Sequence, residues 1–206
     1  MSFPEKHYPE AGDYAAVYRD EIVRAWQELD RGAIARAAGM LDTAIRGGYT
    51  IFSCGNGGSA AIANHLLCDF VKGIQTDTTL RPKVTSLSSH LELITAIAND
   101  IAYEEIFVYQ LRSLAQPGDL LMTISSSGNS ENIVRAVEWS LGNRVGSIAF
   151  TGFDGGRSAG LADVNLHVAA NNYGIVEDVH QSLMHLLAQY LRQSAMPIDL
   201  ISQRRF

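Results

Sequence analysis

Apolar residues recur every three or four positions between residues 13 and 47, a stretch that contains no proline. This spacing is the period of an α-helix with one apolar face. The polar sequence at 30–32 interrupts the pattern, and the glycine pair at 47–48 ends it. We therefore expect two helices within residues 10–47, ahead of the main body of the domain.

The rest of the chain alternates short runs of β-branched and aromatic residues with longer helical patterns. The predicted strands cover residues 49–54, 83–87, 120–124, 146–150 and 164–168. The predicted helices cover residues 59–72, 90–98, 103–114, 132–141, 155–160 and 176–191. This alternation predicts one α/β domain over residues 1–206, with a five-stranded parallel sheet covered by helices on both faces.

Composition narrows the classes of function. With 206 residues, 47% of them hydrophobic, the chain is long enough for one well-buried core. A net charge of -6 argues against general binding of nucleic acids. The apolar runs are too short to cross a membrane, and the N-terminus lacks the pattern of a signal peptide. Two cysteines are too few for a disulfide framework, so we expect a cytoplasmic protein without membrane or nucleic-acid partners.

Two loops rich in glycine or serine follow predicted strands and precede predicted helices. The first reads Gly-Asn-Gly-Gly-Ser at 55–59, and the second reads Ser-Ser-Ser-Gly-Asn-Ser at 125–130. Glycine allows the backbone to approach a ligand closely, and the N-terminus of a helix attracts anions. We therefore expect both loops to bind the phosphate of a phosphorylated sugar. The expected contacts are Asn56, Gly57, Ser59, Ser125, Ser126, Ser127 and Ser130.

Other interpretations of these loops are less well supported. A single glycine-rich turn between a strand and a helix is often only a tight turn, and serine runs often cap helices. Neither loop has the Gly-Lys-Ser/Thr of a Walker A motif. The first loop lacks the complete Gly-x-Gly-x-x-Gly pattern, so a dinucleotide site, as in a dehydrogenase, is weakly supported.

Four segments together resemble the sugar isomerase (SIS) domain family. They are Cys-Gly-Asn-Gly-Gly-Ser-Ala-Ala at 54–61, Ala-Ile-Ala-Asn-Asp at 96–100, Ile-Ser-Ser-Ser-Gly-Asn-Ser at 124–130 and Phe-Thr-Gly-Phe-Asp-Gly-Gly at 150–156. The phosphoheptose isomerases are the most similar branch, and the resemblance covers residues 15–193. It implies a flavodoxin-like fold and a homotetramer. It also implies interconversion of sedoheptulose 7-phosphate and D-glycero-D-manno-heptose 7-phosphate.

An aldose–ketose isomerase moves a proton between neighbouring carbons, so it needs a base, an acid or a metal near them. His65 and Asp69 are four residues apart on one predicted helix and so share a face. By resemblance His65 is a metal ligand, and His185 is a ligand or an acid–base group. Asp69 and His185 are thus the expected proton-transfer pair. Zinc is the expected metal, with His65, Asp69, Glu177 and His185 as ligands.

Three positions depart from the family pattern. Asp69 stands where the isomerases usually carry glutamate, and Glu177 stands where they carry glutamine. The shorter side chain withdraws the carboxylate by about 1.5 Å, whereas Glu177 adds a negative charge. Gly174 replaces an aspartate that contacts substrate hydroxyls, while Asp100 is kept and is an expected hydroxyl ligand.

Two rival hypotheses follow from the same resemblance. One relative of the isomerases is a non-catalytic tetramer that binds the replication initiator DnaA and has lost the catalytic carboxylate and histidine. Because Asp69, His65 and His185 are present here, we favour the enzyme over such a regulator. The other hypothesis, a sugar-sensing transcription factor, needs a DNA-binding segment before the SIS domain. We reject it, because only about 45 residues precede the first strand and they are acidic to neutral.

Overall fold

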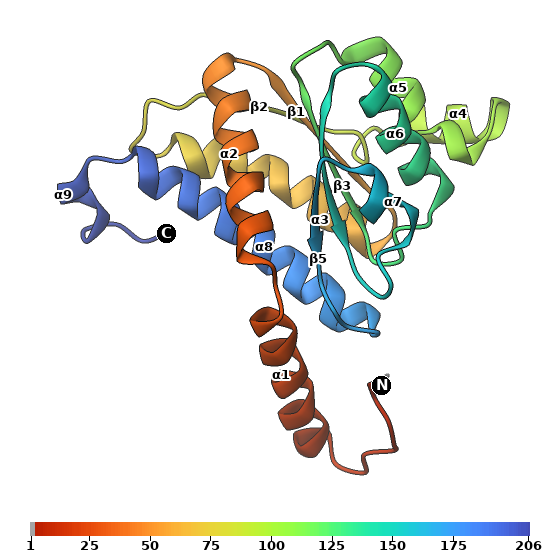
Figure 1. The fold of residues 1–206 in the computed structure, drawn as a ribbon, viewed down its shortest axis with the longest axis vertical. Coiled ribbons are helices and arrows are strands. Elements are labelled where there is room, and N and C mark those ends of the chain that lie inside the picture. The colour runs from red at the N-terminus through yellow and green to blue at the C-terminus, as the bar shows by residue number, and fades with distance from the viewer. Residues whose placement is uncertain (1–2) are drawn as a thin grey trace.

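The computed structural model describes residues 3–206, and its centre is a sheet of five parallel strands (Figure 1). The strands are β1 (Thr50–Gly55), β2 (Lys83–Ser86), β3 (Leu120–Ser125), β4 (Gly146–Thr151) and β5 (Val164–His167). Their order across the sheet is β2-β1-β3-β4-β5, which is the flavodoxin-like order. The predicted fold class, with five parallel strands, is therefore confirmed.

The central strands are buried on both faces, as their nearly continuous apolar sequences predict. All six residues of β3 are buried. Along β1, Ile51 packs into one hydrophobic cluster and Phe52 into another. Leu120 and Leu121 of β3 divide between the same two clusters, so the sheet separates two layers of core.

Helices cover each of these two layers (Figure 1). The layer that contains Ile51 is covered by α2 (Arg31–Gly47), α3 (Gly58–Cys68) and α8 (Tyr173–Ala195). The layer that contains Phe52 is covered by α4 (Leu91–Asp100), α5 (Val108–Leu114) and α6 (Glu131–Gly142). A short helix, α7 (Gly156–Leu161), packs beside α6 and β4.

The two predicted N-terminal helices are present. They are α1 (Ala11–Gln27) and α2. Asp30 caps α2 by accepting a hydrogen bond from the Gly32 amide at 2.7 Å, and Gly48 ends α2 with a φ of 71°. Glycine suits that left-handed position because it has no Cβ. Helix α1 extends away from the sheet, and its main neighbour is α8 (Figure 1).

Some element boundaries differ from the prediction. The helix expected over residues 59–72 is α-helical only to Cys68 and continues as a π-helix, η1 (Asp69–Ile74). The helix expected over residues 103–114 begins with a 3₁₀ turn, η2 (Tyr103–Glu105). Helix α8 starts three residues before the predicted 176, because the Asn172 side chain caps it by accepting a hydrogen bond from the Ile175 amide. A short helix after it, α9 (Ile198–Ile201), was not predicted.

Candidate active site

The two predicted loops lie side by side because β1 and β3 are neighbours in the sheet. Gly55 at the end of β1 is paired with Ile124 near the end of β3. The strand order reverses between these two strands, and open α/β sheets bind ligands at that point. Helix α3 starts directly after the first loop and α6 directly after the second. Two helix N-termini therefore flank one crevice.

The crevice holds a small cavity of about 140 Å³. It is lined by Asn56, Ser59, Ile124, Ser125, Ser126, Ser127, Ser130, Tyr173 and Glu177. All the predicted phosphate contacts except Gly57 are in this set, and Gly57 is the N-cap residue of α3. Glu177 is the one charged side chain among the lining residues.

The hydroxyl groups of this cavity are buried to different degrees and have different partners. Ser126 is buried, and within residues 3–206 its Oγ has no hydrogen-bond partner. A buried hydroxyl without a partner costs about 1–3 kcal/mol, so Ser126 Oγ is free to form a hydrogen bond with a ligand that enters the cavity. Ser125 Oγ instead accepts a hydrogen bond from the Gly128 amide at 3.2 Å, which shapes the second loop.

Gly128 is required by the shape of the second loop. Its φ is 62°, and a Cβ at this position would collide with the backbone of Gly155. Ser158 also donates a hydrogen bond from its Oγ to the Gly128 carbonyl at 2.8 Å. The segment 150–156, one of the four that carry the family resemblance, therefore packs against the serine loop through Gly155.

Asn56 is held by two partners that the sequence analysis did not identify. Its side-chain amide exchanges two hydrogen bonds of 2.9 Å with that of Asn132. Tyr103 Oη also donates to Asn56 Oδ1 at 3.0 Å, from η2. The reciprocal amide pair joins the first loop to α6. No sequence signal links these positions, because they are 47 and 76 residues away from Asn56.

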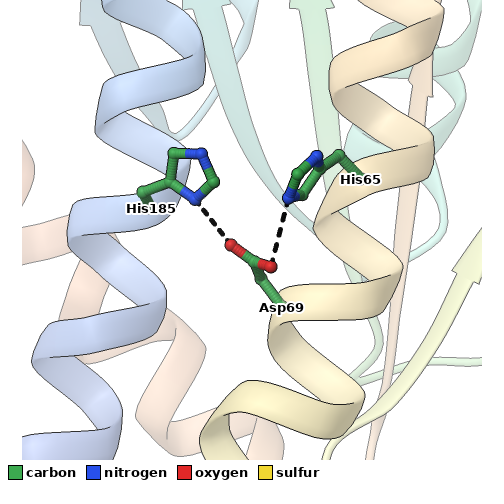
Figure 2. A group of neighbouring side chains, drawn as sticks. All are labelled: His65, Asp69 and His185. Atoms are coloured by element: carbon green, nitrogen blue, oxygen red, sulfur yellow. Dashed lines mark hydrogen bonds and ion pairs between the residues drawn. The ribbon is translucent and has the colours of Figure 1, made fainter. Parts of the chain in front are cut away.

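A second cluster of polar side chains, the polar cluster, is formed by residues near the end of α3, at the start of η1 and on α8 (Figure 2). Asp69 is between two histidines, with Oδ1 3.2 Å from His65 Nε2 and Oδ2 2.6 Å from His185 Nδ1. The rings of His65 and His185 are perpendicular, with centroids 5.0 Å apart. The structure thus brings together three of the residues that the sequence analysis selected.

Gln181 contacts the ring nitrogen of His185 that faces away from Asp69. Its Nε2 amide nitrogen is 2.8 Å from His185 Nε2, and an amide nitrogen can only donate. With this orientation of the amide, His185 Nε2 accepts the bond and Nδ1–H donates to Asp69. A cation held by Nδ1 would displace that proton, and Gln181 would then have to turn its amide oxygen toward Nε2. Sequence reasoning missed Gln181, although its position one helical turn before His185 was a usable signal.

The His65–Asp69–His185 cluster has donor atoms that fit a divalent metal. One atom from each residue lies within 4.8 Å of the others. In a tetrahedral zinc site with bonds of about 2.1 Å, donor atoms are about 3.4 Å apart, so small side-chain movements suffice. Two imidazoles and one carboxylate form a common catalytic zinc set, which leaves one position open.

Glu177 does not join this group, although it was expected as a fourth ligand. It lies two helical turns before His185 on α8, about 12 Å along the axis. Its carboxylate lies against Gly58 instead, so that a Cβ on Gly58 would be 2.7 Å from Glu177 Oε1. Burial and the neighbouring Asp178 carboxylate raise the pKa of Glu177 above its ordinary value.

Asp100 does not line the cavity. It is the last residue of α4, and its Oδ1 accepts a hydrogen bond of 2.7 Å from Asn99 Nδ2. Its side chain is exposed. Its expected contact with substrate hydroxyls remains a prediction.

His180 is a buried histidine on α8, between Glu177 and His185 in the sequence. Its Nε2 donates to the Thr151 carbonyl at 3.1 Å, while Nδ1 has no partner within residues 3–206. Burial lowers the pKa of His180 to about 4, and the bond to Thr151 opposes this shift only in part. His180 is therefore neutral at physiological pH and fastens α8 to the end of β4.

Comparisons with known proteins agree with this architecture. The model of the SIS domain family matches residues 13–152. The phosphoheptose isomerase of Alteromonas mediterranea is 40% identical over 169 residues, which cover 81% of this chain and 85% of the relative. The phosphoheptose isomerase of Shewanella sp. strain ANA-3 is 39% identical over 170 residues, with coverage of 81% and 86%.

Solved structures give the same result. Phosphoheptose isomerase GmhA from Neisseria gonorrhoeae superimposes with a TM-score of 0.80 at 30% identity, covering 88% of this chain and 99% of that one. A phosphoheptose isomerase from Francisella tularensis superimposes with a TM-score of 0.81 at 28% identity, covering 88% and 96%. The chain belongs to the SIS domain family, in its phosphoheptose isomerase branch.

Proposed function

We propose that this SIS-family protein is an aldose–ketose isomerase that interconverts sedoheptulose 7-phosphate and D-glycero-D-manno-heptose 7-phosphate. One observation carries the proposal. Helices α3 and α8 pack against each other. The cavity lined by the loop serines, here called the anion cavity, lies at their first turns, and the His65–Asp69–His185 cluster lies further along the pair. The relatives named above are phosphoheptose isomerases, which supports the same substrate class. The rival hypothesis of a non-catalytic regulator has no support among them.

The distance between the two ends suits a phosphorylated sugar of this size. Gly58 and His65 are seven residues apart on α3, or about 10 Å along the helix axis. An extended chain advances about 1.2 Å per bond, as in a polypeptide, where three bonds span about 3.5 Å. Eight bonds separate C1 from phosphorus in an open-chain heptose 7-phosphate, which gives about 10 Å. The phosphate can then occupy the cavity while C1 and C2 lie at the cluster.

The polar cluster supplies groups for proton transfer between C1 and C2. Asp69 is the proposed base, since a carboxylate can accept the proton from carbon. His185 is the proposed partner that gives or takes the second proton at the substrate oxygen. The Gln181 amide orients its ring by donating to Nε2. Both residues would contact the substrate and are therefore proposed catalytic residues.

The proposed metal ligands are His65, Asp69 and His185, and zinc fits their donor atoms best. A bound divalent cation would polarise the substrate carbonyl and stabilise negative charge on its oxygen. Proton transfer is assigned to Asp69 and His185, so the proposed task of His65 is to hold the cation. Asp69 would hold the cation through one carboxylate oxygen, and the other oxygen would accept the proton once its contact with His185 Nδ1 opens.

We also propose a cytoplasmic homotetramer. A cleft of about 820 Å³ between α1, α2 and α8 is lined by apolar side chains that include Trp26, Ile34 and Leu186. Val23 and Tyr190 are exposed on the same helices. Burial of such surface against other copies of the chain is the usual reason to retain it. Within residues 3–206, no helix is long and apolar enough to cross a bilayer.

The deciding experiment is an assay of the purified protein with sedoheptulose 7-phosphate, with and without added zinc. We expect formation of the aldose heptose 7-phosphate, and we expect Asp69→Asn to remove it. Non-phosphorylated sedoheptulose serves as a control ligand that tests the need for the phosphate. A protein that binds the sugar phosphate but never converts it, under any metal condition, would contradict the proposed enzyme.

A further inference from the structure

The carboxylate of Glu177 occupies the place where a ligand phosphate would meet helix α3. It lines the same cavity as the loop serines. A Cβ on Gly58, the first residue of α3, would lie 2.7 Å from its Oε1 and 2.8 Å from its Cδ. The carboxylate therefore rests on the first turn of α3, at the positive end of the helix dipole.

Nothing else in the described chain neutralises this carboxylate. No side chain or amide within residues 3–206 forms a hydrogen bond or an ion pair with Glu177, and no lysine or arginine lines the cavity. The other polar residues of the cavity are neutral serines, an asparagine and a tyrosine. The Glu177 carboxylate is therefore an anion that already occupies a cavity of neutral donors and helix N-termini, the kind of site that binds phosphate.

We propose that Glu177 is a specificity-determining residue that competes with the ligand phosphate for the N-terminus of α3. This inference rests on the proposed sugar-phosphate function and deepens it. When a phosphorylated sugar enters, the carboxylate must turn away from Gly58 or remain close to the phosphate. In either case the phosphate binds less tightly than it would beside a neutral side chain of the same shape.

The competition acts on the charge of the ligand. Electrostatic repulsion is proportional to ligand charge, so a phosphate dianion is disfavoured more than a monoanion, and a neutral sugar hydroxyl is not disfavoured. Glu177 therefore lowers the affinity of the site for the phosphate group without weakening the contacts to the sugar. Binding energy then depends more on the sugar and the polar cluster, and phosphorylated product leaves more readily.

The test compares Glu177→Gln with the wild-type protein in calorimetric titrations with inorganic phosphate at pH 8, where phosphate is mainly a dianion. We expect roughly tenfold tighter binding in the variant, as one unit charge near a dianion implies even with strong solvent screening. Asp178→Asn is the matched control, because it removes one charge from the next residue, whose carboxylate points to Tyr18 Oη at 2.7 Å. We expect that control to change phosphate affinity less than twofold.

A zinc titration of the same proteins separates this role from that of a metal ligand. We expect zinc affinity to stay within about twofold in Glu177→Gln, since Glu177 is not part of the His65–Asp69–His185 group. Unchanged or weaker phosphate binding in Glu177→Gln, or a loss of zinc affinity, would overturn the inference. If Glu177→Gln does not fold, Glu177→Ala gives the same comparison, because it also removes the charge.

The outcome also separates this inference from the proposed function. If the wild-type protein binds phosphate and Glu177→Gln binds it no better, only the competition fails. If neither protein binds phosphate or sedoheptulose 7-phosphate, the cavity is not a phosphate site. The proposed function and the inference then both fail.

Discussion

The two ends of the α3–α8 pair achieve their chemistry by different means. The anion cavity is lined by five serines and an asparagine, so several neutral polar side chains can share one ligand. At the other end, three side chains, His65, Asp69 and His185, form the cluster, and each makes contacts that no other residue duplicates. The first end should tolerate the loss of one side chain, whereas the second should not.

The largest expected effect is at the polar cluster. Asp69→Asn keeps the shape of the side chain and removes the proposed base. It also replaces the acceptor of His185 Nδ1–H by an amide that is a weaker acceptor. We expect kcat to fall by about 10²–10⁴-fold, the usual contribution of general acid–base catalysis. Steady-state kinetics with sedoheptulose 7-phosphate measure it.

Asp69→Glu is the informative companion of this variant, because it restores the side chain that is usual in the family. An increase in kcat would mean that the shorter carboxylate is too far from its target, and a decrease would mean that the site is built around aspartate. An active enzyme in which Asp69→Asn has wild-type kcat would exclude Asp69 from proton transfer. It would also remove the contrast between the two ends.

A second prediction concerns His180, which fastens α8, the helix shared by both ends, to the end of β4. Its pKa falls from the ordinary 6.5 to about 4 in the folded protein, so the unfolded chain binds more protons between these values. The contribution of His180 to the free energy of unfolding should therefore be fully present above pH 6.5, and it should be lost as the pH falls toward 4. The total loss from this group is about 3 kcal/mol, at 1.36 kcal/mol for each unit. Urea unfolding over this pH range measures it.

His180→Gln is the matched variant, since glutamine retains a donor for the Thr151 carbonyl and does not titrate. We expect its unfolding free energy to depend less steeply on pH between 6.5 and 4. Equal pH slopes for the two proteins would mean that His180 is not what makes the fold sensitive to acid. Because His180 holds the middle of α8, acid should weaken phosphate and zinc binding together.

A smaller effect is expected at the serines of the cavity. Ser59→Ala should weaken binding of sedoheptulose 7-phosphate by about 1–3 kcal/mol, the usual loss of one hydrogen bond to a charged group. Ser127→Ala should behave in the same way. Isothermal titration measures both affinities. Ser182→Ala is the control, because its Oγ bonds the Asp178 carbonyl on the exposed side of α8.

Wild-type affinity in both serine variants would mean that the two loops are structural turns. An additive loss in the double variant would mean that the two serines act as independent donors. A much larger loss in either single variant would break the comparison, because the cavity would then depend on one side chain as the polar cluster does.

The fold could be predicted from the sequence because its signals are local. Short runs of β-branched and aromatic residues predicted all five strands, helical spacing of apolar residues predicted the principal helices, and glycines at positions such as 48 marked where helices end. The anion loops were found for the same reason, since each is continuous in sequence. His65 and Asp69 were found because helical spacing puts residues i and i+4 on one face.

The sequence could not place contacts that depend on how distant elements pack. The position of Glu177 in the anion cavity follows from the way α8 lies along α3, which no local pattern encodes. The Asn56–Asn132 pair joins the first loop to α6 across 76 residues of sequence. Asp69 begins a π-helix, where the sequence predicted one continuous helix over residues 59–72. Tertiary packing decides each of these.

The smallest expected effect concerns the N-terminal helix, which belongs to neither end. Tyr18 Oη on α1 donates to Asp178 Oδ2 on α8 at 2.7 Å, next to Glu177. Burial, with the bond to Asp178, raises the pKa of Tyr18 well above its ordinary value, so the hydroxyl stays protonated and can donate. The bond is partly open to solvent. Tyr18→Phe should therefore lower the free energy of unfolding by only about 0.5–1 kcal/mol, as measured by urea unfolding.

Tyr14→Phe is the control for this variant, because it removes a hydroxyl from the same aromatic cluster without breaking a hydrogen bond that the described residues form. The Tyr18 bond holds the first turns of α8, so its loss should alter phosphate affinity slightly and leave zinc affinity unchanged. Equal effects on the two affinities would mean that α8 moves as one rigid unit. The anion cavity and the polar cluster would then be coupled through their shared helix, rather than being independent ends of the site.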